Sequence, residues 1–185
     1  MPAVTRPTGT ALPVIAHVPH ASTVIAADVR AELLLSDEEL ADELLWLTDH
    51  DTDALFAGLT ELGATLFVND VSRLVFDPER FLDDSFEPMA ARGQGVVYWQ
   101  GTRGQLIREA STEVRTRRVA ELYRPYHAAL DALVKEVLES FEECLVIDCH
   151  SFATQPLPSE IDQSPDRPDI CIGTDPVHTP AALSG

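Results

Sequence analysis

Short β-branched apolar runs alternate along this chain with stretches of helical periodicity. The runs have the length and composition of buried strands, and they cover residues 14–18, 64–68, 144–148 and 169–173. Strands separated by helices predict an α/β protein with a largely parallel sheet. Because neither an internal repeat nor a linker interrupts the pattern, we expect one domain over residues 1–185.

Helical signals fill the intervals between the predicted strands. A Ser-Asp-Glu-Glu capping box at 36–39 precedes leucines spaced at i, i+4 and i+7, which predicts a helix. A second helix is predicted from about 53 to 62. A long helical region is predicted from about 106 to 141, and Pro125 is expected to kink or divide it. The glycine-rich stretch 94–104 is expected to form a loop.

The composition restricts the classes of function. Hydrophobic residues make up 45% of the chain, which is enough for a core and argues against disorder. The 13 Lys and Arg against 31 Asp and Glu give a net charge of −18, which disfavours nucleic-acid and anionic-membrane partners. No apolar run approaches the roughly 20 residues of a membrane span, and the amino end lacks the apolar core of a secretory signal. The three cysteines are too few for a disulfide framework, so we expect free thiols and a cytoplasmic location.

Ionisable side chains follow three of the predicted strands, where parallel strands present their carboxyl ends at one edge of a sheet. They are His20, Asp70, Arg73, Asp148 and His150. Two imidazoles, His20 and His150, together with one carboxylate would form the protein ligands of a catalytic zinc ion that leaves its fourth position to water. In the alternative, each histidine caps its strand and hydrogen-bonds the backbone. Asp148 either orients His150 or a neighbour as a hydrogen-bond acceptor, or caps a turn.

The stretch 48–53 offers the missing carboxylate. Asp49 and Asp53 share one helix face at i, i+4 spacing, whereas Asp51 points elsewhere. Three like charges so close repel one another, and a bound cation would relieve that repulsion. The alternative is that Asp51 or Thr52 caps the second helix.

Arginines follow the second predicted strand in a strongly acidic chain. Arg73 and Arg80 suit a small carboxylate ligand, because a guanidinium grips a carboxylate through two parallel hydrogen bonds. Alternatively, Arg73 pairs with Asp77 and only fixes the loop. Arg103 in the glycine-rich loop is a further candidate for the same anion, whereas His127 in the long helical region is expected to be structural.

Five motifs occur in the order found in the N-formylglutamate amidohydrolase family, which the chain resembles over about residues 14 to 175. They are Val18-Pro-His-Ala-Ser22, the stretch 49–56, Ser72-Arg-x-x-x-Asp-x-x-Arg80, Leu122-Tyr-Arg-Pro-Tyr-His127 and Asp148-Cys-His-Ser151. The resemblance implies a three-layer α/β/α sandwich around a mixed, largely parallel sheet of the phosphorylase/hydrolase type, related to the zinc carboxypeptidases and aspartoacylases. It also implies hydrolysis of N-formyl-L-glutamate to formate and glutamate, late in histidine breakdown.

The resemblance assigns roles to individual residues. His20 and His150 match metal-binding histidines, and Asp49 matches a recurrent aspartate that we take as the third zinc ligand, with Asp51 in reserve. Arg73 and Arg80 match arginines that suit the carboxylates of the substrate.

The chain also departs from the family pattern. Members commonly have Asn before the last arginine of the third motif, where this chain has Glu79. Members also continue beyond the point that corresponds to Gly185, through a segment with a Glu near an Asn-Arg pair that would suit a general base. The chain is therefore expected to lack the family's C-terminal segment, and no catalytic acid or base is assigned.

Two classes of function follow from these residues. In the first, a zinc-dependent amidohydrolase polarises the amide carbonyl and lowers the pKa of its water toward about 7 while arginines orient the substrate. In the second, a catalytically impaired domain of the same fold binds a small carboxylate ligand without turnover. A third possibility is an acidic structural protein whose histidines are incidental.

Overall fold

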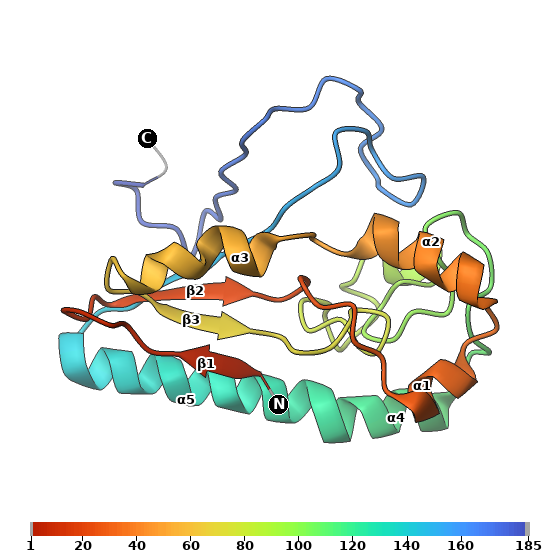
Figure 1. Ribbon diagram of the computed structural model, residues 1–185, viewed down its shortest axis with the longest axis horizontal. Helices are drawn as coiled ribbons and strands as arrows, with labels where there is room; N and C mark the ends of the chain where they lie inside the picture. Colours follow the sequence, from red (N-terminus) through yellow and green to blue (C-terminus); the bar gives the residue numbers. More distant parts are fainter. Residues whose placement is uncertain (1, 184–185) are drawn as a thin grey trace.

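A mixed four-stranded sheet lies at the centre of the computed structural model, which describes residues 2–183 (Figure 1). Its strands are β1 (Ala3–Thr5), β2 (Val14–Val18), β3 (Thr65–Val68) and β4 (Leu145–Asp148). The order is β1-β3-β2-β4, with β2 parallel to both of its neighbours and β1 antiparallel to β3. The predicted α/β class and three of the predicted strands are therefore confirmed, each to within one residue.

Two strand assignments differ from the sequence prediction. The prediction of a strand at 169–173 is wrong, because this segment has no regular structure and its isoleucines, Ile170 and Ile172, are 82% and 83% exposed. An apolar run forms a strand only where a sheet edge accepts it, and this run does not reach one. Conversely, β1 went unpredicted because its three residues are exposed and it joins the sheet through its backbone pairing with β3.

Helices occur at the three predicted stretches with shifted boundaries, and the helices at 27–32 and 90–92 were not predicted. They are α1 (Ala27–Glu32), α2 (Asp37–Leu47), α3 (Thr52–Phe56), the short helices η1 (Ala57–Thr60) and η2 (Ala90–Arg92), α4 (Thr112–Arg118), the π-helical turn η3 (Val119–Tyr123) and α5 (Arg124–Phe141). The capping box is confirmed: the Ser36 hydroxyl accepts from the Glu39 amide, and the Glu39 carboxylate accepts from the Ser36 amide. Pro125 lies in the first turn of α5, directly after the π-helical turn, where its missing amide proton costs little.

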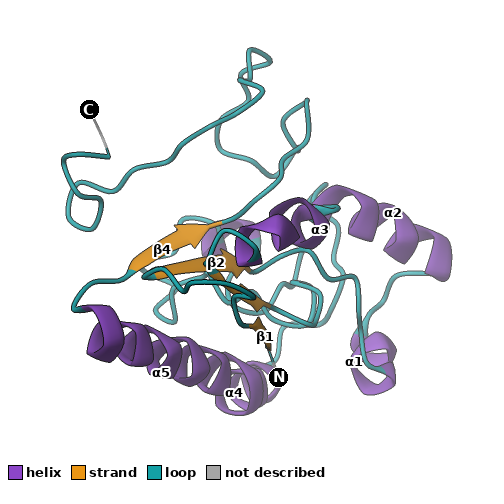
Figure 2. Ribbon diagram, turned by 60° about the vertical axis from the view of Figure 1, so that its left-hand side comes forward, coloured by secondary structure: helices purple, strands orange, loops and turns teal. Residues whose placement is uncertain are grey.

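Helices lie on both sides of the sheet. On one face α5 packs its apolar side over β2 and β3, joining Ile15 and Phe67 to Leu133 and Val137. On the other face Phe56 of α3 and the neighbouring η1 cover the smaller side chains of β2 and β3 (Figures 1 and 2). The outer strand β4 is only partly covered, and its Val146 and Ile147 are 39% and 40% exposed. The complete three-layer sandwich therefore stays a prediction.

A separate hydrophobic cluster fixes α2 beside the carboxyl edge of the sheet. Leu40 and Leu47 of α2 pack on Leu74, Tyr98 and Ile107, which come from the segments after β3. This packing places the end of α2 and the loop around Tyr98 next to the segments that follow β2 and β4. Within residues 2–183, no helix combines the length and the apolarity that crossing a membrane requires.

Candidate functional site

A cavity of about 510 Å³ opens where β2 and β4 end. Its polar lining includes His20, Asp49, Arg73, Glu79, Arg80 and His150. Its apolar lining includes Trp46, Met89, Phe152 and Leu157. Cavities of this size bind small molecules through a few placed polar groups, which is the arrangement seen here.

The two predicted histidines meet at this cavity. His20 follows β2 and His150 follows β4, and these strands are parallel neighbours, so the two side chains emerge at the same edge. The ring centroids lie 5.4 Å apart. The side chain of His20 is 2% exposed, whereas that of His150 is 37% exposed.

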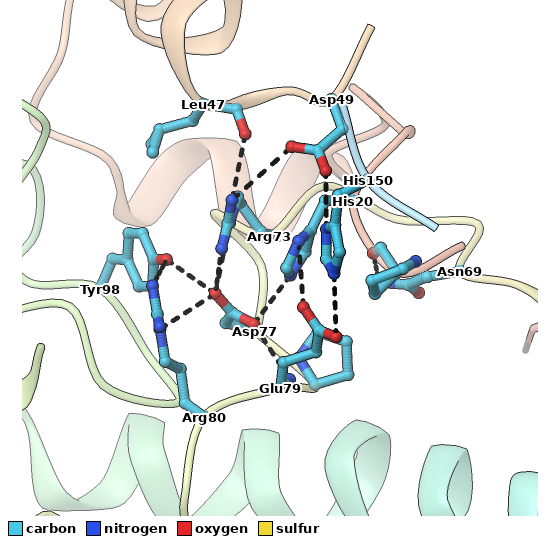
Figure 3. A network of polar contacts seen from close by, with 12 residues as sticks. His20, Leu47, Asp49, Asn69, Arg73, Asp77, Glu79, Arg80, Tyr98 and His150 are labelled. Atoms are coloured by element: carbon cyan, nitrogen blue, oxygen red, sulfur yellow. Dashed lines mark hydrogen bonds and ion pairs between the residues drawn. The ribbon is translucent and has the colours of Figure 1, made fainter. Parts of the chain in front are cut away.

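The Glu79 carboxylate contacts both rings on the side away from Asp49 (Figure 3). Its Oε2 is 3.4 Å from Nδ1 of His20, and its Oε1 is 3.3 Å from Nε2 of His150. Nδ1 of His20 is buried and has no hydrogen-bond partner among residues 2–183. One inward nitrogen of each histidine therefore faces the same carboxylate.

The outward nitrogen of each ring is held by a different carboxylate. Nε2 of His20 is 2.9 Å from Oδ1 of Asp77, and Nδ1 of His150 is 2.9 Å from Oδ2 of Asp49. Such pairing fixes the orientation of an imidazole and directs the lone pair of its other nitrogen. Asp49, predicted as the third metal ligand, thus contacts the outward nitrogen of His150, while Glu79 contacts the inward nitrogens of both rings.

Burial and charge act differently on the two histidines. Burial, reinforced by the positive charge of Arg73, lowers the pKa of His20, so that its ring is neutral at neutral pH. Burial would also lower the pKa of His150, but its hydrogen bonds to Asp49 and Glu79 outweigh that effect and raise the pKa to about 10. In the metal-free site, His150 therefore holds a proton between two carboxylates.

Asp77 organises the arginine side of the cavity. Its buried carboxylate accepts from Arg73 at 2.8 and 3.2 Å and from the Tyr98 hydroxyl at 2.7 Å. Nε of Arg80 lies 3.3 Å from the same carboxylate. Burial would raise the pKa of Asp77, but Arg73 and His20 hold it well below its usual value. The Arg73–Asp77 pairing raised as the alternative to ligand binding is present, and both arginines nevertheless line the cavity.

Three other predicted residues make different contacts from the ones expected for them. Arg103 forms an exposed ion pair with Asp42 at 2.6 Å and does not line the cavity. Asp51 is exposed in a left-handed turn (φ 59°) that precedes α3, so it does not reach the two histidines. Asp148, predicted to orient His150 or a neighbour or to cap a turn, contacts Nδ1 of His17.

Sequence reasoning missed two side chains of the site. His17 lies inside β2, where it was treated as part of an apolar run; a histidine in a buried strand was the available signal. Glu79 was noted only as a departure from the family pattern. That departure was the signal, because an acidic side chain replaces a neutral one directly beside the histidines.

The motif at 122–127 positions the loop that carries Glu79. The Tyr123 hydroxyl donates to the Arg80 carbonyl at 3.0 Å, and Nε2 of His127 donates to the Pro78 carbonyl at 2.8 Å. The two donors therefore hold the backbone on either side of Glu79. The prediction that His127 is structural agrees with this contact.

Comparisons with known proteins identify relatives of the same kind. The model of the N-formylglutamate amidohydrolase family matches residues 12–183. Two N-formylglutamate deformylases, from Pseudomonas putida and Pseudomonas aeruginosa, are each 29% identical over 170 residues, which is 88% of this chain and 59% of each relative. The chain thus spans less than two thirds of their length.

Two solved structures are also similar to this chain. A crystal structure of N-formylglutamate amidohydrolase from Ralstonia eutropha is 26% identical with a TM-score of 0.73, covering 82% of this chain and 57% of that one. A gene product of Agrobacterium tumefaciens shares the fold, with 23% identity and a TM-score of 0.59. The match covers 82% of this chain and 56% of that one.

Proposed function

Because the chain belongs to the N-formylglutamate amidohydrolase family, we propose that its cavity hydrolyses the amide bond of an N-formyl acidic amino acid. N-formyl-L-glutamate is the expected substrate, and formate and the free amino acid are the products. One observation carries the proposal: inward nitrogens of two histidines converge with a carboxylate at the floor of a cavity lined by arginines.

The donor set fits a zinc ion. A tetrahedral ion with bonds of about 2.1 Å separates its donors by about 3.4 Å. Glu79 approaches His20 through Oε2 at 3.4 Å and His150 through Oε1 at 3.3 Å, and one donor atom of each of the three residues lies within 4.8 Å of the others, so small side-chain rotations would complete the set. The unpartnered Nδ1 of His20 supports the same assignment, since a buried donor or acceptor without a partner is costly. We therefore propose His20, Glu79 and His150 as the ligands, with Asp49 and Asp77 orienting the two rings.

The remaining groups of the cavity bind and orient the substrate. A bound zinc ion would supply a polarised carbonyl and a water of lowered pKa. Arg73 and Arg80 present guanidinium groups to the carboxylates of the substrate, and both are fixed by Asp77, so little side-chain entropy is lost on binding. Holding the substrate in this way fixes the position of its formyl group relative to the inward histidine nitrogens.

Metal content and formate release test the proposal together. The purified chain is expected to release formate from N-formyl-L-glutamate, to lose this activity with a chelator and to regain it with zinc. His150→Ala and Glu79→Gln should each abolish both zinc binding and formate release, while the exposed His178→Ala serves as the matched control. Absence of zinc binding, or zinc binding that survives His150→Ala, contradicts the proposed centre. Binding of N-formyl-L-glutamate without formate release would assign the non-catalytic role instead.

A further inference from the structure

A second group of possible metal ligands shares Glu79 with the proposed centre. We propose that His17, Asp148 and Glu79 form a second divalent-cation site, so that Glu79 bridges two ions. The inference rests on the proposed function for the first ion. The first site takes its histidines from the segments that follow β2 and β4. The second site takes His17 from β2 itself and Asp148 from β4 itself.

The sheet itself builds this second group. His17 and Asp148 are paired residues on the parallel strands β2 and β4, so their side chains extend from the same face of the sheet. Nδ1 of His17 contacts Oδ1 of Asp148. One donor atom from each of His17, Asp148 and Glu79 lies within 4.8 Å of the others. Bonds of about 2.1 Å require donors about 3.4 Å apart, so small side-chain rotations would complete the shell.

Tyr126 gives His17 the protonation pattern that a ligand needs. Its hydroxyl contacts Nε2 of His17 on the buried side of the ring. When Nε2 donates its proton to this hydroxyl, the lone pair of Nδ1 faces Asp148 and Glu79. Metal-binding histidines are held in this way by a hydrogen bond to the second nitrogen. Without a cation, the opposite tautomer satisfies the same contacts, because Tyr126 donates to Nε2 and Nδ1 donates to Asp148.

The charges around Glu79 favour cations. The site carries more carboxylates than guanidinium groups: Asp49, Asp77, Glu79 and Asp148 against Arg73 and Arg80. One divalent ion balances this excess, so a second ion is expected to bind more weakly and to tighten when an anionic ligand enters. The side chain of Asp148 is 57% exposed, which leaves the second site open to solvent. An ion there would add positive charge next to Glu79, which lines the cavity.

Titration of the chelator-treated chain with Co²⁺, followed by calorimetry and by metal analysis, tests the inference. The wild type is expected to bind about two ions per chain, in a tight and a weaker step. Asp148→Asn removes one anionic ligand at a half-exposed position and should abolish the weaker step while retaining the tight one. His17→Gln should do the same, and His178→Ala should match the wild type. Addition of L-glutamate should tighten the weaker step in the wild type.

Two spectroscopic readouts do not depend on activity. The manganese-loaded wild type should give the electron paramagnetic resonance spectrum of a coupled ion pair, and Asp148→Asn that of isolated ions. The ¹⁵N shifts of His17 should change tautomer with the second equivalent of Zn²⁺. A single step in the wild type that Asp148→Asn leaves unchanged overturns the second site and leaves the proposed function intact. A second step that survives both variants places that ion elsewhere and also overturns it. Failure of the wild type to bind any ion overturns the proposed function.

Discussion

Asp77→Asn tests the electrostatic centre of the site. Asp77 has no exposed surface, and its two oxygens divide their partners. Oδ2 accepts from Arg73 and Tyr98, while Oδ1 lies 2.9 Å from Nε2 of His20 and 3.0 Å from the Glu79 amide. An asparagine amide keeps an oxygen on only one side, so its NH₂ group must face donors on the other. The substitution also removes the negative charge from the buried guanidinium of Arg73.

The expected loss follows from these contacts. Removing one member of a buried, hydrogen-bonded ion pair costs about 3–5 kcal/mol, because the remaining charge is left uncompensated. Full burial of Asp77 means that solvent does not screen this cost. His20 also loses the carboxylate that orients its ring, and loss of such a partner lowers metal affinity by about 10–100-fold.

Urea unfolding of the metal-free protein at neutral pH measures the first effect, and chelator competition for zinc measures the second. Asp42→Asn is the control, because its ion pair with Arg103 is exposed and is expected to contribute at most about 1 kcal/mol. A loss of unfolding free energy below about 1 kcal/mol for Asp77→Asn would refute the reasoning, because the buried Arg73–Asp77 pair would then contribute no more than an exposed ion pair does.

The pH dependence provides a second check on Asp77. Its pKa is lowered in the folded state, chiefly by Arg73 acting against the effect of burial. The stabilisation by its charge is therefore present above the unfolded pKa of about 3.9 and is lost as pH falls through the folded pKa. The difference in unfolding free energy between wild type and Asp77→Asn should accordingly shrink in acid. A difference that grows as pH falls would contradict the assignment.

Three further predictions concern other parts of the molecule. Glu43→Gln should lower the unfolding free energy measured in urea by about 1–3 kcal/mol, because the buried Glu43 carboxylate accepts hydrogen bonds from the amide and hydroxyl of Thr102, at 2.6 and 3.1 Å. An unchanged urea midpoint would show that these hydrogen bonds do not stabilise the fold. Leu133→Ala should cost about 2–5 kcal/mol, since this α5 side chain is 4% exposed in the core against the sheet; thermal unfolding measures it, and a shift no larger than that of an exposed α5 leucine would contradict the packing. The exposed Cys171 should react with a thiol reagent before Cys149, because burial raises the pKa of the Cys149 thiol to about 11. Mass spectrometry of the labelled peptides gives the order of reaction, and equal rates would contradict the burial of Cys149.

Much of the fold was predictable because its signals are local. The β-branched runs of β2, β3 and β4 and the capping box of α2 lie within a few residues of one another along the chain. The segment 169–173, wrongly predicted as a strand, has the same apolar pattern as the true strands. A local pattern of this kind does not indicate whether a neighbouring strand is available for pairing. The short strand β1 has no such pattern and pairs through its backbone.

The candidate site was predictable only in part. The positions of His20 and His150 after strands indicated that they share an edge, and the structure places β2 next to β4. The departure from the family pattern at Glu79 marked this position, but it did not indicate that the carboxylate contacts both rings. Likewise, Asp49 and Asp51 are nearly adjacent, and the turn before α3 directs one toward His150 and the other to solvent.

The sequence by itself determined the α/β class, the family, the strongly acidic character and the residue types available for metal and carboxylate binding. The tertiary structure alone decided which carboxylate faces the histidines, which arginines line the cavity and that His17 joins Asp148. The physical reason is that secondary structure follows from contacts between residues close in the chain. A ligand shell is set instead by strand order and loop packing, which bring together side chains as far apart as His20 and His150.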